Sequence, residues 1–106
     1  MKLLNKIGDV TYFEFNQHEY YALIAVKKLE RHENLFIKSY RVYLECVGGK
    51  SILEVQSEGT PVQLSEQDAL IRCLMANRNN NNTIGEIKND FYEAVNCPVL
   101  IDGGLL

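Results

Sequence analysis

The sequence predicts an α+β fold: a mainly antiparallel sheet of about five strands, with two C-terminal helices packed on one face. Two observations predict it. Residues up to about 64 form segments rich in aromatic and β-branched side chains, which are typical of strands. The apolar spacing then becomes helical, and strands followed by segregated helices are typical of α+β proteins. An all-β barrel decorated with helices is the alternative.

Two strands are expected in the first part of the chain. Residues 10–15 are rich in aromatic and β-branched side chains, and a polar turn follows at residues 16–19. Residues 20–26 form a nearly continuous apolar run, which is typical of a strand buried on both faces. The sequence therefore places this second strand centrally in the sheet, and the charged residues 27–34 after it in a loop.

The glycine pair at residues 48 and 49 predicts a β-hairpin between strands at residues 35–47 and 50–56. A two-residue Gly-Gly loop suits a type I′ turn, because both central residues of that turn need positive φ. In this register the apolar side chains of the two strands face each other on one side of the sheet, and a slip of one residue would move them to the other side. A short extended piece at residues 62–64 is expected to follow.

The first helix is expected to begin at Ser65. Ser65 lies three residues before Asp68, which is the spacing of a capping box with Asp in place of Glu. Residues 69–75 are apolar around most of the helix circumference, and Arg72 lies with Asp68 on the polar side. The polar run at residues 77–82 ends this helix.

The second helix is expected to begin at Thr83, because Thr83 and Glu86 form a second capping box. It stops before Pro98, since the residue before a proline disfavours helical geometry. A short last strand at residues 99–101 and a turn follow. Helical spacing groups the apolar side chains on one face, namely Ile84, Ile87, Phe91, Ala94 and Val95.

The length and composition indicate one globular domain, residues 1–106. The chain holds no apolar run of the roughly 18–20 residues that a membrane span needs. Its beginning lacks the apolar core of a secretion signal. We therefore expect a cytoplasmic protein with reduced cysteines and no membrane partner.

No pattern of catalytic, metal-binding or cofactor-binding residues stands out. His18 and His32 lie among charged neighbours and are expected to be exposed in loops. Cys46, Cys73 and Cys97 form no CxxC pair. We expect Cys46 and Cys73 to be buried within apolar segments and Cys97 to be more accessible. The sequence therefore predicts no catalytic residues, no metal and no cofactor, and hence no enzyme.

Charge is distributed unevenly along the chain, whose formal net charge is −3. The first half, residues 1–53, has eight basic and six acidic residues, whereas residues 54–106 have three basic and eight acidic ones. The acidic second half repels nucleic acid and attracts a basic partner. A modest basic cluster in the first half is interrupted by acidic residues, which further disfavours nucleic-acid binding.

The acidic excess lies partly on one face of the second helix, where its spacing places the acids opposite the apolar side chains. Tyr92, at the edge of this arc, offers an aromatic anchor for a partner. The sequence therefore predicts a small acidic inhibitor of the immunity-protein or antitoxin type, which neutralises a basic partner such as a nuclease toxin. The expected partner-binding residues are Glu86, Asn89, Asp90, Tyr92 and Glu93.

Two other functions are compatible with the sequence. A small-ligand-binding or enzymatic domain would have a pocket between sheet and helices, and its lining would come from four tyrosines, Tyr12, Tyr20, Tyr40 and Tyr43. A subunit of a homo-oligomer would associate through the ends of the sheet or through the last two leucines. The sequence leaves the oligomeric state open.

Overall fold

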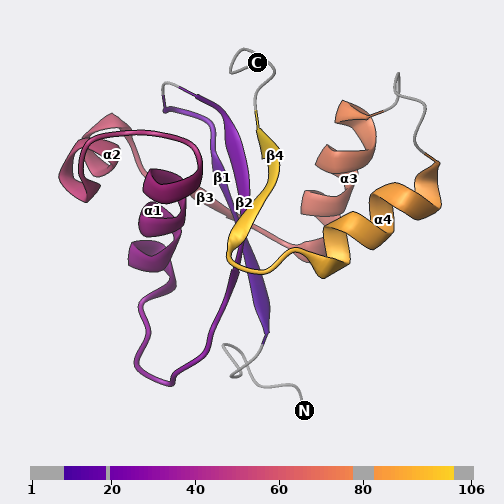
Figure 1. The fold of residues 1–106 in the computed structure, drawn as a ribbon, viewed down its shortest axis with the longest axis horizontal. Helices are drawn as coiled ribbons and strands as arrows, with labels where there is room; N and C mark the ends of the chain where they lie inside the picture. The colour runs from indigo at the N-terminus through magenta and orange to yellow at the C-terminus, as the bar shows by residue number, and fades with distance from the viewer. Residues whose placement is uncertain (1–8, 19, 78–82, 102–106) are drawn as a thin grey trace.

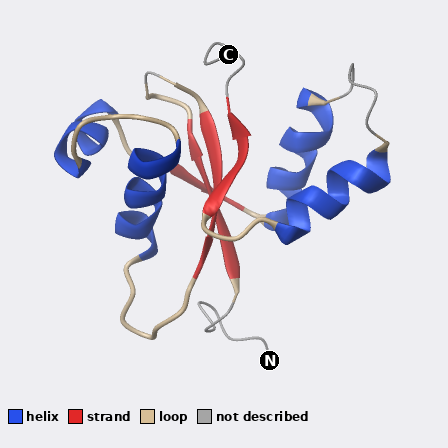
Figure 2. Ribbon diagram, in the orientation of Figure 1, coloured by secondary structure: helices blue, strands red, loops and turns tan. Residues whose placement is uncertain are grey.

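A computed structural model describes residues 9–18, 20–77 and 83–101. Within these residues four antiparallel strands form one sheet in the order β3-β1-β2-β4. Two helices lie on each side of the sheet (Figure 1), and Figure 2 shows the strands between the two helix pairs. The elements are β1 (Val10–Phe15), β2 (Ala22–Lys27), α1 (Leu35–Cys46), α2 (Ile52–Glu58), β3 (Val62–Leu64), α3 (Glu66–Ala76), α4 (Ile84–Glu93) and β4 (Cys97–Ile101).

The strand β2 lies between β1 and β4, which confirms its central place in the sheet. Its residues Ala22 to Val26 are fully buried. Successive side chains of a strand point to opposite faces, so a strand covered on both faces needs apolar residues throughout. Ile24 packs in the core beneath α1 and α2, whereas Leu23 and Ala25 pack beneath α3 and α4.

Each face of the sheet carries its own apolar core. Beneath α1 and α2, Phe15 stacks on Tyr43 with ring centroids 4.8 Å apart. Beneath α3 and α4, Tyr12 stacks on Phe91, also at 4.8 Å. Aromatic pairs at this separation add stability beyond the area they bury. The two stacks therefore help to hold α1 and α4 on opposite faces.

The expected hairpin at residues 35–56 is wrong, because this segment forms α1 and α2. The apolar residues of this segment fit both a helical and an alternating period, so the N-cap residues decide in favour of helices. Oδ1 of Asn34 accepts a hydrogen bond from the backbone N–H of Ile37, and Oγ of Ser51 accepts one from Glu54. Both residues are N-caps, which satisfy backbone donors at the start of a helix. The glycine pair lies between the two helices, where the backbone N–H of Gly48 bonds to the carbonyl oxygen of Tyr43.

The α+β class is confirmed, but its details differ from the expectation. The sheet has four strands among the described residues, and helices are interleaved with strands and cover both faces. An all-β barrel is therefore wrong. The two later helices do share one face, and both of their caps are confirmed: Ser65 caps α3, and Thr83 with Glu86 forms a capping box on α4. Asn77, the first residue of the expected polar run, caps the end of α3. The rest of that run, residues 78–82, and the last two leucines lie outside the described residues.

An ion pair between a buried carboxylate and a half-exposed arginine joins α3 to the sheet. The Glu14 side chain on β1 is only 8% exposed, and its Oε2 accepts hydrogen bonds of 2.7 Å from Nε of Arg72 and from the Tyr21 hydroxyl. Burial alone would raise the pKa of Glu14, but the hydrogen bonds from Arg72 and Tyr21 lower it below the ordinary value. Glu14 therefore stays charged and fixes α3 against β1.

Among the described helices, none is long and apolar enough to span a membrane.

Candidate functional site

The helix α4 carries all five residues that the sequence predicts as partner-binding. Each of them is exposed, and none takes part in the apolar core. Ile87 and Phe91, on the same helix, are buried against the sheet. However, Ile84 and Val95, which were expected on the apolar face, are 64% and 42% exposed. The structure thus places the five residues on the solvent-exposed part of α4.

The carboxylate of Glu86 has a structural role as well as a charge. Its Oε1 accepts a hydrogen bond of 2.9 Å from the backbone N–H of Thr83, whose Oγ1 accepts one from the N–H of Glu86. These bonds lower the pKa of Glu86 below its ordinary value. Any test of its charge must therefore keep the capping box, which glutamine can also form.

The acidic surface extends beyond α4 to the start of α3. The hydroxyl of Tyr92 donates a hydrogen bond of 3.3 Å to Oε2 of Glu66, the first residue of α3. Burial and the nearby Glu66 carboxylate raise the pKa of Tyr92. Asn89 in turn donates to Oε1 of Glu93 at 3.2 Å. Sequence reasoning missed Glu66, because 26 residues separate it from Tyr92 and no local pattern links them.

The helix pair α3–α4 is strongly acidic in its described part. Its basic residues are Arg72, which pairs with Glu14, and Lys88. No described ion pair involves an acid of α3 or α4. The acids of this pair, all exposed, are Glu66, Asp68, Glu86, Asp90 and Glu93. Five of the eight acids of the second half of the sequence thus lie on one layer of the fold.

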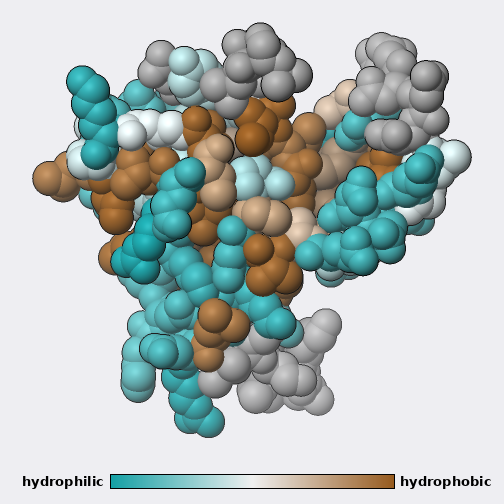
Figure 3. Space-filling model, viewed as in Figure 1, coloured by the Kyte–Doolittle hydropathy of each residue, from teal (hydrophilic) through white to brown (hydrophobic). Residues whose placement is uncertain are grey.

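An open groove of about 350 Å³ lies between α3, α4 and β4. Asp90 and Glu93 line it together with apolar side chains, among them Phe91 of α4, Ala94 just after that helix and Pro98 of β4. In the space-filling view, hydrophilic side chains over α4 lie beside hydrophobic ones over β4 (Figure 3). The groove therefore combines an apolar lining with two carboxylates.

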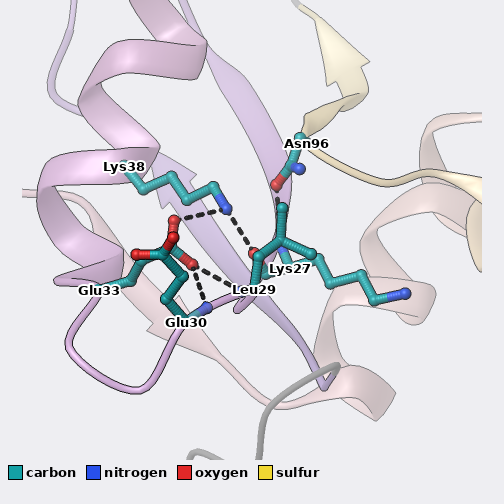
Figure 4. Close-up of polar contacts among 6 residues, drawn as sticks. All are labelled: Lys27, Leu29, Glu30, Glu33, Lys38 and Asn96. Atoms are coloured by element: carbon teal, nitrogen blue, oxygen red, sulfur yellow. Dashed lines mark hydrogen bonds and ion pairs between the residues drawn. The ribbon is translucent and has the colours of Figure 1, made fainter.

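In the loop between β2 and α1, the charged side chains of Glu33 and Lys38 are bonded within the fold (Figure 4). The Glu33 carboxylate accepts hydrogen bonds from the backbone N–H groups of Leu29 and Glu30, at 2.6 and 3.1 Å, and pairs with Nζ of Lys38 at 2.9 Å. The bond from Leu29, followed by that from Lys38, lowers the pKa of Glu33 to about 2. Lys38 also donates to the carbonyl oxygen of Lys27. Lys38 is thus engaged within the fold, which weakens the modest basic cluster of this region as a surface for nucleic acid.

His18 is buried, contrary to the expectation of an exposed loop residue. Only 8% of it is exposed, and its Nε2 lies 2.7 Å from the carbonyl oxygen of Val55, near the end of α2. Its ring packs on Phe15 and Tyr43. Because a carbonyl only accepts, Nε2 carries the hydrogen, while the buried Nδ1 has no partner among the described residues. His18 satisfies a helix-end carbonyl, and His32 is exposed as expected.

The cysteines are only partly where they were expected. Cys73 is buried, which raises the pKa of its thiol to about 11, but Cys46 is exposed at the end of α1. Cys97 is half-buried, and all three thiols are free. Within the described part of the chain no three potential metal ligands gather.

The tyrosines that were expected to line one ligand pocket lie in different places. Tyr12 of β1 is buried beneath α3 and α4, whereas Tyr40 and Tyr43 belong to α1 and are buried against the opposite face of the sheet. The Tyr43 hydroxyl donates to the carbonyl oxygen of Tyr20, so Tyr20 lies with them. The sheet separates Tyr12 from the other three tyrosines, so the four line no common pocket.

Comparison with known families adds one result. The model of the YosH C-terminal domain family matches residues 10–101, from the first residue of β1 to the last residue of β4. The chain belongs to the YosH C-terminal domain family. Neither the curated proteins nor the solved structures that were compared gave a match. The four strands and both helix pairs all lie within the part that matches the YosH C-terminal domain.

Proposed function

We propose that this YosH C-terminal domain is a non-enzymatic protein-binding module that presents α4 to a basic protein partner. The observation that carries the proposal is the set of exposed acids on α3 and α4 that form no ion pair within the described chain. An acid that is paired inside its own fold contributes little to a partner, whereas an unpaired one attracts and orients a basic surface.

The tyrosine beside these acids also supports a protein partner. Tyr92 is 51% exposed on α4, with its hydroxyl directed to Glu66. Exposed tyrosines combine a large apolar ring with a polar end and are enriched among the residues that dominate binding energy. A rigid helix flanked by charges and carrying such a ring has the composition of a protein-binding face.

More specifically, we propose that the domain is an inhibitor of the immunity-protein or antitoxin type, which occupies the basic site of a toxin such as a nuclease. Acidic complementarity speeds such an association and blocks a positively charged active site. We also propose a cytoplasmic location, which the three free thiols support.

The experiment is the capture of partners by the immobilised chain at two ionic strengths. At about 0.1 M salt the Debye length is about 10 Å, and at about 1 M it is about 3 Å, so exposed charge pairs are largely screened at the higher salt. We expect a basic protein to be retained at the lower salt and released at the higher. Retention of no basic protein, or retention that does not change with salt, would contradict the proposal.

A further inference from the structure

The groove between α3, α4 and β4 has two chemically distinct parts. Ile87, Phe91 and Ala94 of the α4 segment contribute apolar lining, and Pro98 of β4 adds to it from the strand. Asp90 lies three residues after Ile87, so its carboxylate shares the helix face that borders this lining. With about 350 Å³, the groove is at the lower end of the roughly 300–1,000 Å³ typical of ligand sites, which suits one inserted side chain.

The carboxylates of the groove have no described basic neighbour that neutralises them. In the described chain, ion pairs join Glu33 to Lys38 and Glu14 to Arg72, and neither involves Asp90 or Glu93. Glu93 accepts one hydrogen bond, from the uncharged amide of Asn89. The groove therefore keeps a negative charge beside an apolar surface.

Lysine and arginine side chains match this combination. Each has an apolar stem that packs on apolar surface and a cationic head that seeks a carboxylate. An anionic group would be repelled by Asp90 and Glu93, and a neutral apolar group would remove water from the two carboxylates without pairing them. We propose that the groove receives a lysine or arginine side chain of the basic partner, with the stem along Phe91 and Ala94 and the head at Asp90 and Glu93.

This inference rests on the proposed function and names how the partner is recognised. It adds that recognition depends on the shape of the groove as well as on the charge of α4. Filling the groove without changing any charge therefore tests the inference separately.

The thiol of Cys97 reports occupancy, because it lines the groove and is half-buried. The whole chain carrying Cys46→Ser, which removes the exposed thiol at the end of α1, is treated with a maleimide. The probe is the peptide acetyl-Gly-Arg-Gly-amide, and the control is the same peptide with citrulline, which has nearly the shape of arginine but no charge.

The arginine peptide should slow alkylation of Cys97, and the citrulline peptide should not. At about 10 mM peptide, a site with a Kd of about 1 mM is about nine-tenths occupied, so the rate should fall by up to about tenfold. An unchanged rate, or equal protection by the two peptides, would overturn the inference.

Two variants separate the parts of the groove. Asp90→Asn with Glu93→Gln removes the charge at exposed positions, and Ala94→Leu fills the lining without altering charge. Each should abolish protection by the arginine peptide, and the circular dichroism spectrum checks that each has folded. Because both positions of the first variant are exposed, it stays informative if Ala94→Leu does not fold.

Capture of the basic protein distinguishes the inference from the proposed function. If Ala94→Leu folds and still retains that protein at full strength, the groove is not the point of recognition, although binding by α4 stands. If the arginine peptide protects Cys97 but no basic protein is captured, the proposed function fails on its own.

Discussion

Oε2 of Glu14 on β1 lies 2.7 Å from Nε of Arg72 on α3, although 58 residues separate the two in sequence. The Tyr21 hydroxyl donates to the same oxygen. We expect Glu14→Gln to lower the free energy of unfolding by about 1–3 kcal/mol, because it removes a buried charge that two donors hold. This loss of stability is smaller than the loss expected when a fully buried ion pair is broken, because the Arg72 side chain is 45% exposed and water can solvate it.

Urea unfolding of wild type, Glu14→Gln and the exposed control Glu45→Gln measures this difference. Glu45 lies on the surface of α1, where a change of charge usually alters stability by less than about 0.5 kcal/mol. If the two variants are equally stable, the ion pair does not fasten α3 to the sheet.

Acid should weaken the loop before α1 through Glu33. Its pKa in the folded chain is about 2, well below its ordinary value of 4.5. Over the range between these two values the unfolded state binds more protons, so stability falls as pH drops through that window. We expect Glu33→Gln to be less stable than wild type near pH 7 and to lose less stability than wild type on acidification.

Urea midpoints from pH 7 to about pH 2 give the two profiles. Glu30→Gln is the matched control, because its carboxylate accepts none of the loop's hydrogen bonds described for Glu33. Parallel pH profiles for wild type and Glu33→Gln would show that Glu33 does not hold the loop.

Two glycine-to-alanine changes should act in opposite directions. Gly59 has φ 150° and ψ 177°, a conformation essentially confined to glycine, and an added Cβ would collide with the side chain of Gln17. Gly59→Ala should therefore cost about 1–3 kcal/mol. Gly85 lies within α4 with no crowding neighbour, so Gly85→Ala should stabilise by about 0.5–1 kcal/mol. Thermal unfolding measures both changes. If Gly59→Ala unfolds at the same temperature as wild type, the backbone conformation described for Gly59 is contradicted.

His18 should contribute to stability through its hydrogen bond as well as its ring. His18→Phe keeps an aromatic ring against Phe15 and Tyr43 but removes the donor to the carbonyl of Val55, so it should cost about 1 kcal/mol. His18→Ala also removes the ring and should cost about 3–5 kcal/mol. Equal stability of wild type and His18→Phe in urea would mean that only the ring matters.

The caps and the helical spacing of the second half made its helices predictable. Ser65, Thr83 and Glu86 act through residues three positions away, so the sequence contains the whole interaction. The first half was predicted less well, because residues 35–47 fit two periods and the glycine pair suits a hairpin turn as well as a helix end. The residues that decide between the two are Asn34 and Ser51, whose side chains cap α1 and α2.

The candidate site was predictable only where it lies on one helix. The exposed face of α4 follows from helical spacing, but Glu66 joins it through a contact that no local pattern encodes. The groove needs three elements to meet, and the burial of His18 depends on a carbonyl 37 residues away. Such relations arise from tertiary packing, which a single sequence does not display.

Two sets of substitutions that change the net charge equally decide whether the acidic face of α4 binds a basic protein. The test set is Glu86→Gln, Asp90→Asn and Glu93→Gln on α4, in which the glutamine introduced at position 86 keeps the capping box. The control set, in the loop before α1, on α1 and on α2, is Glu30→Gln, Glu45→Gln and Glu54→Gln, all at exposed positions.

The measurement is the amount of basic protein that each immobilised chain retains at about 0.1 M salt. Exposed charge pairs contribute up to about 1 kcal/mol each, so loss of three should reduce affinity by up to about a hundredfold. We predict that wild type and the control set retain the protein equally and that the α4 set loses it. Equal retention by the two sets would contradict the account, because charge on α4 would then matter no more than charge elsewhere.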